Sequence, residues 1–502
     1  MSITGGTFKK RNSSKALLYG GRIILIFSPV LLLLIQSFSS GRNLFMSLPV
    51  WSDELDYWRE MFSFSHNGFG FGGSMFVGHD AALGPMGAHS VSPIAAWGVF
   101  FLLFRSGYAP YAILWGNIFL LTLAWFLFVK LLKPAAGPTW IAVIMAYTYP
   151  MIFLYLHSSM IEMVCMAGMI LYFSILCKWD KEGDNRYFVL LIILGIWITA
   201  VRITYVVILF PVIWKKLNFR FNLKAVISMI VYVLGFLGFY KPYNLFCADY
   251  PGWVTSRIND AEGIREKLSV IFYNTRVNLI TYFAPTSGDR AQVGMRYFYF
   301  VLLLFLLGAA VRNVDVKVKS KVNMLFISLA IMMGGLLVMM LTLYDIGLWR
   351  DFRTFAPLAF GVFLFLMLKE NSDGLYRTFL YSFFILVSMM SFTSGVDFIK
   401  DKGITTVTDK SAYFENLELT DEEGAPRTIG VDPKINWGDI TFMSSVPSKL
   451  GVQVFYGDLW EEDMKLVDYV LVTDENYEKL RELFDGCEVT VIPGYGRLVK
   501  NF

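Results

Sequence analysis

Long apolar runs separated by short charged segments dominate the chain. A helix needs about 20 apolar residues to cross the hydrocarbon of a bilayer. The runs near that length are residues 22–38, 110–130, 139–156, 160–177, 188–213, 225–240, 297–311, 322–343, 354–368 and 376–391. A run at 92–104 is shorter, which indicates a re-entrant or interfacial helix. The pattern predicts an α-helical polytopic membrane protein with about 11 membrane helices, counting 188–213 as two.

Lysine and arginine gather between these runs, and such segments usually face the cytoplasm. They are residues 9–22, Lys130 with Lys133, 178–186, 215–224, 312–321 and 369–377. All fall on one side if 92–104 does not cross and if 188–213 folds back near Arg202 as two short legs. The N-terminus is then cytoplasmic. The segments expected outside are 39–109, 157–160, the turn at Arg202, 241–296, 344–353 and everything after 395. If 92–104 crosses and 188–213 is one span, the large loops stay outside but 157–160 and Arg202 do not.

Residues 395–502 differ from the rest and predict a small C-terminal α/β domain, joined to a membrane domain over 1–394. They carry 21 Asp and Glu against 11 Lys and Arg, a net charge of −10, whereas the whole chain has +4. Strands are expected at Thr428–Val431, Val452–Tyr456, Tyr469–Val472 and Val489–Ile492, with a helix at Asn476–Phe484. We expect this domain to be extracytoplasmic.

Composition excludes several classes of protein. The chain of 502 residues is 56% hydrophobic and only 17% charged, and its mean hydropathy is +0.53, so it is not a soluble enzyme. Nucleic acid is not an expected partner, because the cations lie where lipid headgroups and membrane orientation already explain them. A multi-pass protein of the cell (plasma or inner) membrane is expected.

The stretch Trp51-Ser-Asp-Glu-Leu-Asp-Tyr-Trp-Arg59 follows the first apolar run. It holds Asp53 and Glu54 among aromatic side chains that favour the membrane interface. In a helix, Asp53 and Tyr57 share a face at i and i+4. One interpretation is a capped interfacial helix with its acids at the N-terminus; the other is a functional carboxylate pair at the lipid boundary.

The rest of the first large loop favours the functional interpretation. It carries Gly68-Phe-Gly-Phe-Gly-Gly73, His79-Asp80 and His89-Ser-Val-Ser-Pro93 before the short apolar run. With the Asp53-Glu54 pair, this loop resembles the GT-C superfamily of membrane glycosyltransferases that use polyprenyl-phosphate sugars. Protein O-mannosyltransferases and aminoarabinose transferases are examples of this type. The resemblance implies an inverting transfer on the outer face, from a polyprenyl-phosphate carrier to a glycan, lipid or protein acceptor.

The resemblance and the chemistry together assign roles to individual residues. Asp53 is expected to take the proton of the acceptor hydroxyl, and Glu54 to orient the sugar. Tyr57 and His89 are expected to bind substrate, as is Glu162, for which the alternative is a paired intramembrane acid. Cations for the phosphate are expected at Arg202, Arg350 and Arg353. For Arg350 and Arg353 the alternative is pairing with Asp345 or Asp351.

Histidines of the first loop leave the metal requirement open. His66, His79 and His89 with Asp80 match no compact ligand spacing, so no metal ligand is predicted, although some relatives of this class use a divalent cation. Two other functions remain: a flippase or transporter of lipid-linked saccharide, and a polysaccharide polymerase or ligase with a diphosphate-linked donor. A transporter favours charged residues spread along a path between helices.

Overall fold

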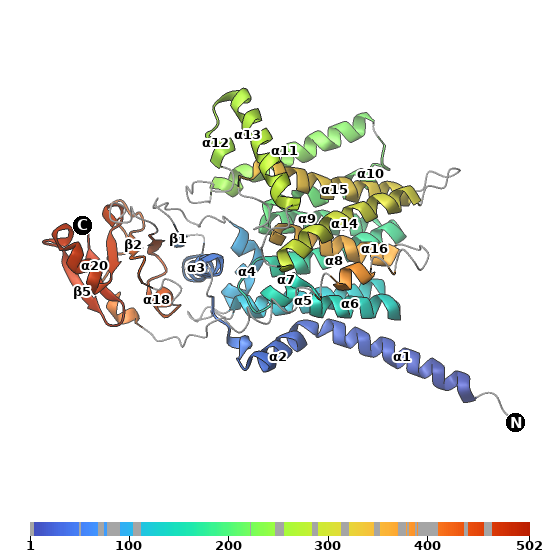
Figure 1. The fold of residues 1–502 in the computed structure, drawn as a ribbon, viewed down its shortest axis with the longest axis horizontal. Helices are drawn as coiled ribbons and strands as arrows, with labels where there is room; N and C mark the ends of the chain where they lie inside the picture. The colour runs from blue at the N-terminus through green and yellow to red at the C-terminus, as the bar shows by residue number, and fades with distance from the viewer. Residues whose placement is uncertain are drawn as a thin grey trace.

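A helical bundle with an α/β domain at one end makes up the molecule, as the computed structural model shows (Figure 1). The structure describes residues 5–49, 52–68, 75–77, 91–103, 112–220, 222–245, 256–283, 290–312, 321–345, 352–369, 378, 381–386, 389, 410–435, 440–455 and 464–501. The predicted boundary at 394/395 and most of the predicted run 376–391 lie outside these residues.

Helices α1 to α16 form the bundle and its loops. The first half contains α1 (Gly5–Ile26), α2 (Ser28–Ser40), η1 (Leu44–Met46), α3 (Ser52–Asn67), α4 (Ser92–Leu103), α5 (Ala112–Leu132), α6 (Ala136–Thr148), α7 (Pro150–Tyr155) and α8 (Glu162–Glu182). The second half contains α9 (Asn185–Val201), η2 (Ile203–Ile208), α10 (Leu209–Lys216), α11 (Leu223–Leu245), α12 (Ser256–Asp260), α13 (Gly263–Phe283), α14 (Arg290–Arg312), α15 (Lys321–Leu343) and α16 (Phe352–Lys369).

Helix α8 is the centre of the bundle and shows how the bundle fits a membrane. It packs on α5, α9 and α16. At Gly361 of α16 a Cβ would lie 2.2 Å from the ring of Phe173, so only glycine permits this approach to α8. From Glu162 to Asp180 the helix rises about 27 Å, close to the thickness of the hydrocarbon core. Asp180 pairs there with Lys369 of α16 at 2.6 Å and with Lys215 of α10. We call this the Asp180 end of the bundle, and the opposite end, where α3 lies, the α3 end.

Several apolar helices could cross a membrane, as in a multi-pass membrane protein. Within the described residues, five are long and apolar enough: α5, α8, Leu223–Tyr240 of α11, Val293–Ala310 of α14 and Met324–Leu343 of α15. The pair α1 and α2, bent by 71° just before Pro29, would be a sixth. The number of about 11 stays a prediction.

The predicted fold-back of 188–213 is confirmed. Helix α9 ends at Val201, Arg202 is extended with φ −148° and ψ 110°, and η2 and α10 lead back. Lys216 Nζ donates to Asn185 Oδ1 at 2.5 Å, so the far ends of the two legs meet. The legs pack closely because Gly195 leaves space for Leu209.

Helix α4 stays at the α3 end, as expected for an interfacial or re-entrant helix. Ser92 at its start bonds to the carbonyl of Val201. Trp97 Nε1 donates to Asn117 Oδ1 at 2.9 Å, and Asn117 Nδ2 donates to Ser158 O at 3.0 Å. Since the first turns of α5 lie at the same end as Ser92, the chain enters and leaves α4 on one side of the bundle.

The C-terminal domain is a six-stranded mixed sheet with short helices. Its elements are η4 (Ser411–Tyr413), β2 (Thr428–Val431), α18 (Ile440–Ser445), β3 (Gly451–Val454), η5 (Met464–Leu466), β4 (Tyr469–Val472), α20 (Asp474–Lys479), η6 (Arg481–Phe484), β5 (Glu488–Ile492) and β6 (Gly496–Lys500). The strand order is β1-β3-β2-β4-β6-β5, in which β5 and β6 form an antiparallel hairpin. The four predicted strands are present, and the predicted helix is α20 followed by η6.

One strand of this sheet comes from the first loop. Strand β1 (Met75–Val77) pairs in parallel with β3, with Met75 opposite Val452. The sequence analysis missed β1 and also β6. The first loop and the C-terminal domain therefore lie at the same end of the bundle, as predicted.

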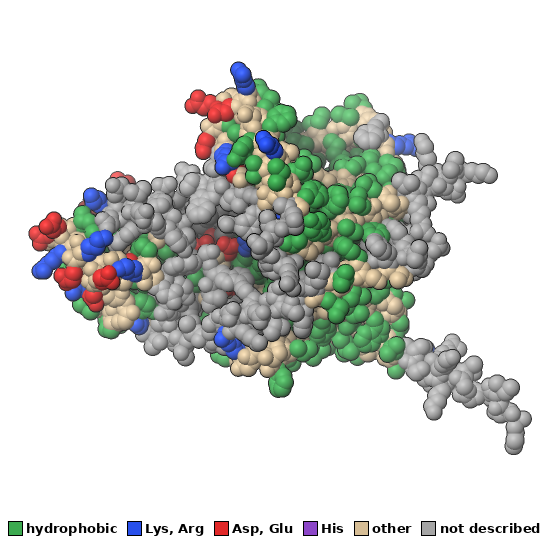
Figure 2. Space-filling view, viewed as in Figure 1, with side chains coloured by type: hydrophobic (Ala, Val, Ile, Leu, Met, Phe, Trp, Pro, Cys, Tyr) green, Lys and Arg blue, Asp and Glu red, His purple; other side chains and the backbone are tan. Residues whose placement is uncertain are grey.

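Surface composition agrees with this arrangement. Figure 2 shows hydrophobic side chains covering the bundle, whereas Lys, Arg, Asp and Glu gather over the C-terminal domain and over α12 and α13. An apolar belt between polar ends is what a bilayer requires of a spanning bundle.

Candidate functional site

Carboxylates and arginines from four separate parts of the chain meet at the α3 end. We call Asp53, Glu54, Glu162, Arg202 and Arg353 the carboxylate–arginine cluster. They come from α3, the start of α8, the turn after α9 and the start of α16. All five were predicted as site residues from the sequence, and the structure brings them together.

Helix α3 supplies Asp53 and Glu54 from its first turn, where negative charge is favoured by the helix dipole. Glu54 is fully buried, and its Oε1 accepts a hydrogen bond from the backbone N–H of Ser159 at 2.9 Å. Asp53 is about a third exposed, and its Oδ2 lies 2.7 Å from Nη1 of Arg353. Glu54 therefore fixes α3 to the bundle, while Asp53 remains accessible.

Glu162 forms the most buried ion pair of the cluster. Its side chain is 2% exposed, and Oε1 accepts from Nη1 of Arg202 at 2.7 Å. The other oxygen, Oε2, is buried and meets no hydrogen-bond donor among the described residues. Nη2 of Arg202 donates to Thr354 Oγ1 at 2.8 Å. The pairing considered for Glu162 as an alternative is thus present, and Arg202 is its partner.

Arg353 lies between the accessible Asp53 and the buried Glu162. It bonds Asp53 through Nη1, and its Nε lies 3.8 Å from Glu162 Oε1. Its side chain is 26% exposed. Asp345, the alternative partner considered from the sequence, instead accepts from the side chain of Asn274 at 2.9 Å and from the backbone N–H of Arg257 at 2.8 Å. Arg353 is therefore a cation of the cluster.

Tyr57 and Asp56 are two further residues of α3 that lie near the carboxylate–arginine cluster. Tyr57 lies against Trp97, with ring centroids 5.7 Å apart. Burial raises the pKa of Tyr57 well above its usual value; the carboxylates of Glu162 and Asp53 raise it further, and the two arginines lower it. The phenol thus stays protonated and can donate a hydrogen bond. Burial and the charge of Asp53 also raise the pKa of Asp56, whose Oδ1 meets no donor among the described residues.

Other predicted site residues are not part of the described cluster. Arg350, His79, Asp80 and His89 lie outside the described residues. His66 is exposed at the C-terminal end of α3, where Nδ1 contacts the carbonyl of Phe62 at 2.8 Å. Within the described part of the chain, no group of three or more His, Cys, Asp or Glu could hold a metal ion.

Three contributors were not predicted from the sequence. Thr354 and Ser159 lie close in sequence to predicted site residues, and this proximity was the only feature of the sequence that could have indicated them. Arg59 ends the stretch quoted for Asp53 and Glu54, and an arginine inside the apolar sequence around it is unusual. It is fully buried and contacts the C-terminal domain.

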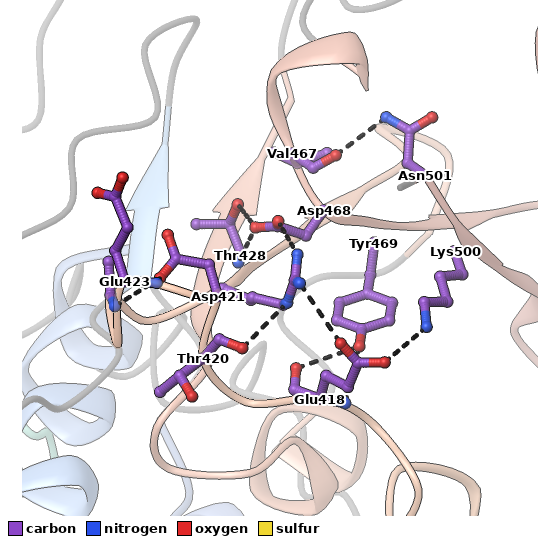
Figure 3. Close-up of polar contacts among 12 residues, drawn as sticks. Glu418, Thr420, Asp421, Glu423, Thr428, Val467, Asp468, Tyr469, Lys500 and Asn501 are labelled. Carbon is purple, nitrogen blue, oxygen red and sulfur yellow. Dashed lines mark hydrogen bonds and ion pairs between the residues drawn. The ribbon is translucent and has the colours of Figure 1, made fainter.

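A second polar cluster lies in the C-terminal domain and is structural (Figure 3). Asp468 accepts from Nη1 of Arg427 at 2.8 Å and from the backbone N–H of Thr428 at 2.8 Å. Glu418 accepts from Lys500 Nζ at 2.8 Å and from Arg427 Nη2 at 3.4 Å. These bonds tie β2, β4 and β6 together, since each charged group finds its partner on a neighbouring strand or loop.

Comparison of the chain with protein-family models and with curated proteins gives no match. Its function is therefore inferred from its own residues.

Proposed function

We propose that the protein is an inverting membrane glycosyltransferase that takes a sugar from a polyprenyl-phosphate carrier at the α3 end of the bundle. The observation that carries the proposal is the convergence of three carboxylates and two arginines next to apolar helices. Charged groups near the hydrocarbon are costly and are kept where they bind a partner or a substrate. In this proposal the α3 end is extracytoplasmic and the Asp180 end is cytoplasmic, in agreement with the positive segments.

Asp53 is the proposed base. The acceptor oxygen attacks the anomeric carbon as its proton passes to Asp53, and the bond from that carbon to the phosphate oxygen breaks, so that the phosphate leaves with its lipid. The accessibility of Asp53, compared with the buried Glu54 and Glu162, supports this choice. Tyr57 is expected to orient the sugar, and Glu54 to support this by fixing α3 to the bundle. Arg353 and Arg202 are the proposed phosphate ligands, because arginine forks match phosphate oxygens.

An apolar groove beside the cluster supports a lipid-linked donor. It lies between α9, η2, α10 and α11 and has a volume of about 450 Å³. Its lining includes Thr199 and Val206, three and four residues from Arg202, and continues to Phe239 of α11. A chain in this groove would bring its phosphate toward Arg202.

The distribution of charge favours a transferase over a flippase. Between Glu162 and Lys178, helix α8 carries no charged residue, and the described ion pairs of the bundle lie at its two ends. A flippase would favour polar groups along a continuous path. A polymerase or ligase with a diphosphate-linked donor would use the same cluster and remains the second candidate.

Asp53→Asn tests the proposal, with Asp260→Asn on the exposed α12 as the matched control. The amide cannot take the acceptor proton, so transfer should fall by about 10²–10⁴-fold. Mass spectrometry of surface glycans and lipid-linked sugars should show the final product losing one sugar while the lipid-linked donor accumulates on the outer leaflet. Accumulation confined to the inner leaflet would support a flippase, and normal product from Asp53→Asn would exclude Asp53 as the base.

A further inference from the structure

Arg59 connects α3 to the C-terminal domain through both terminal nitrogens of its guanidinium group, whereas its buried Nε meets no acceptor among the described residues. Nη1 donates to the carbonyls of Met443 and Val446 at 3.1 and 2.8 Å, and Nη2 to those of Pro447 and Leu450 at 2.5 and 2.9 Å. These carbonyls belong to α18 and the turn after it, where a helix C-terminus carries partial negative charge. Burial lowers the pKa of Arg59 to about 9, so the group is still charged at neutral pH.

Two further residues extend the contact along the same face of α3. Ser63 Oγ donates to Ser448 O at 2.6 Å, and Asn67 Nδ2 donates to Ser448 Oγ at 3.3 Å. Arg59, Ser63 and Asn67 are spaced by four residues, which places them on one side of the helix. We call this side the domain face of α3.

A different side of the same helix carries the proposed site. Asp53 and Tyr57 share one face, Asp53 contacts Arg353, and Glu54 contacts Ser159. Arg59 is only six residues, about 9 Å, from Asp53 along the axis. A helix held on both sides transmits the position of one contact to the other, because packed helices move as units.

We propose that Arg59 is a positioning residue, and that it makes the docked C-terminal domain part of the active site by fixing α3 and thereby Asp53, Glu54 and Tyr57. This rests on the proposed function for its catalytic consequence, though not for the docking. The docked C-terminal domain would thus determine the position of the proposed base, Asp53. The phosphate ligands Arg202 and Arg353 belong to the bundle, so the affinity for the donor should depend on Arg59 much less than kcat does.

Arg59→Met and Arg59→Lys test this, with Arg265→Met on the exposed part of α13 as the control. Hydrogen exchange of the purified full chain should rise in residues 52–67 and 443–450 for Arg59→Met, but not in α8. For transfer, kcat should fall by about 10²-fold, as for a misplacement of about 1 Å, while KM for the donor changes much less. Compared with Arg59→Met, Arg59→Lys should recover part of the protection from exchange and part of kcat, since an ammonium group can still reach some of the carbonyls.

A disulfide gives the decisive rescue. Ser63→Cys with Ser448→Cys, introduced into Arg59→Met without the native cysteines, should restore protection and kcat when oxidised and lose both when reduced. Normal exchange in Arg59→Met, undocking with normal kcat, or oxidation that restores protection without kcat would each overturn the proposal. If the wild-type chain transfers no sugar at all, the proposed function fails, and exchange at residues 52–58 alone decides whether Arg59 positions α3.

Discussion

Arg202→Met should separate the structural role of Arg202 from its proposed role toward phosphate. The substitution leaves Glu162, whose side chain is 2% exposed, without its 2.7 Å partner, and leaves Thr354 without a donor. Removing one member of a buried ion pair costs about 3–5 kcal/mol. Arg202 is 20% exposed and Arg353 stays 3.8 Å from Glu162, so we expect the lower limit, about 3 kcal/mol.

The double-mutant cycle with Glu162→Gln shows whether this loss comes from the pair. Glutamine keeps an oxygen toward Arg202 and removes the charge, so it should cost only about 1 kcal/mol. The double variant should be more stable than the sum of the single losses by about 1–3 kcal/mol. Thermal unfolding in detergent measures each variant, and Arg265→Met, on an exposed helix, should change stability by less than about 0.5 kcal/mol.

Donor affinity of the same variants decides the second role. If Arg202 binds the phosphate, affinity should fall in the order Arg, Lys, Met, by about 10–150-fold for Met, the equivalent of a charge-assisted hydrogen bond of about 1.5–3 kcal/mol. Acceptor affinity should hardly change. Additive stability losses would refute the coupling of Arg202 with Glu162. A destabilised Arg202→Met with normal donor affinity would make Arg202 purely structural and leave the phosphate to Arg353 or Arg350.

Asp56→Asn should remove a pH-dependent loss of stability. The pKa of Asp56 is raised in the folded protein, so its carboxyl stabilises the fold fully below about pH 4 and loses this contribution as the pH rises through the folded-state pKa. Over this rise in pH, the melting temperature of Asp56→Asn should therefore increase relative to that of wild type. A difference between the two melting temperatures that does not change with pH would contradict the prediction. Asn278→Leu should lower the free energy of unfolding by about 1–3 kcal/mol, measured by thermal unfolding, because Asn278 Nδ2 donates to two carbonyls at the end of α15, one at 3.1 Å and one at 2.7 Å; an unchanged stability would show that water replaces it. Cysteines placed at 135 and 182 should be shielded from a membrane-impermeant thiol reagent in intact cells, whereas one at 440 should be labelled; labelling at 135 and 182 with shielding at 440 would reverse the proposed orientation.

The location of the site could be predicted in outline. A charged side chain beside a long apolar run is costly, and this marked Glu162 and Arg202 in the sequence. Asp53 and Glu54 were marked by their place among aromatic side chains that favour the interface, and Arg353 as a cation that could bind phosphate. Residues of this kind lie at the ends of apolar helices, so the sequence had only to indicate at which of the two ends of the bundle each one lies. The positive segments at Lys215 and Lys369 provide that distinction.

Pairings within the site could not be predicted from the sequence. Arg353 and Asp53 are 300 residues apart, and their contact depends on how α16 approaches α8. That approach is decided by the fit of Gly361 against Phe173, which no local pattern encodes. Local pairing with Asp345 or Asp351 was the alternative considered; Asp351 lies outside the described residues, and the structure shows Asp53 as a partner of Arg353.

Strand β1 was missed for a related reason. Its three residues are too few for an alternating pattern to identify a strand, and its partner β3 lies far along the chain. Strand β6 starts with Gly496 directly after a turn, where glycine indicates a loop. Parallel pairing between distant segments leaves no local signal, whereas the strand β4 is a continuous apolar run, as is typical of a buried strand.

The pairing of β1 with β3 also constrains how the protein can be made. Met75 emerges from the ribosome long before Val452, with helices α4 to α16 between them. The sheet therefore cannot close until those helices are inserted and the later strands have crossed to the same side. Synthesis proceeds at about 5–20 residues per second, so β1 waits on the order of tens of seconds for its partner. During that time its unpaired backbone is open to misassembly, which makes this stage of biogenesis the one at which a chaperone on the side of the α3 end would have the most to protect.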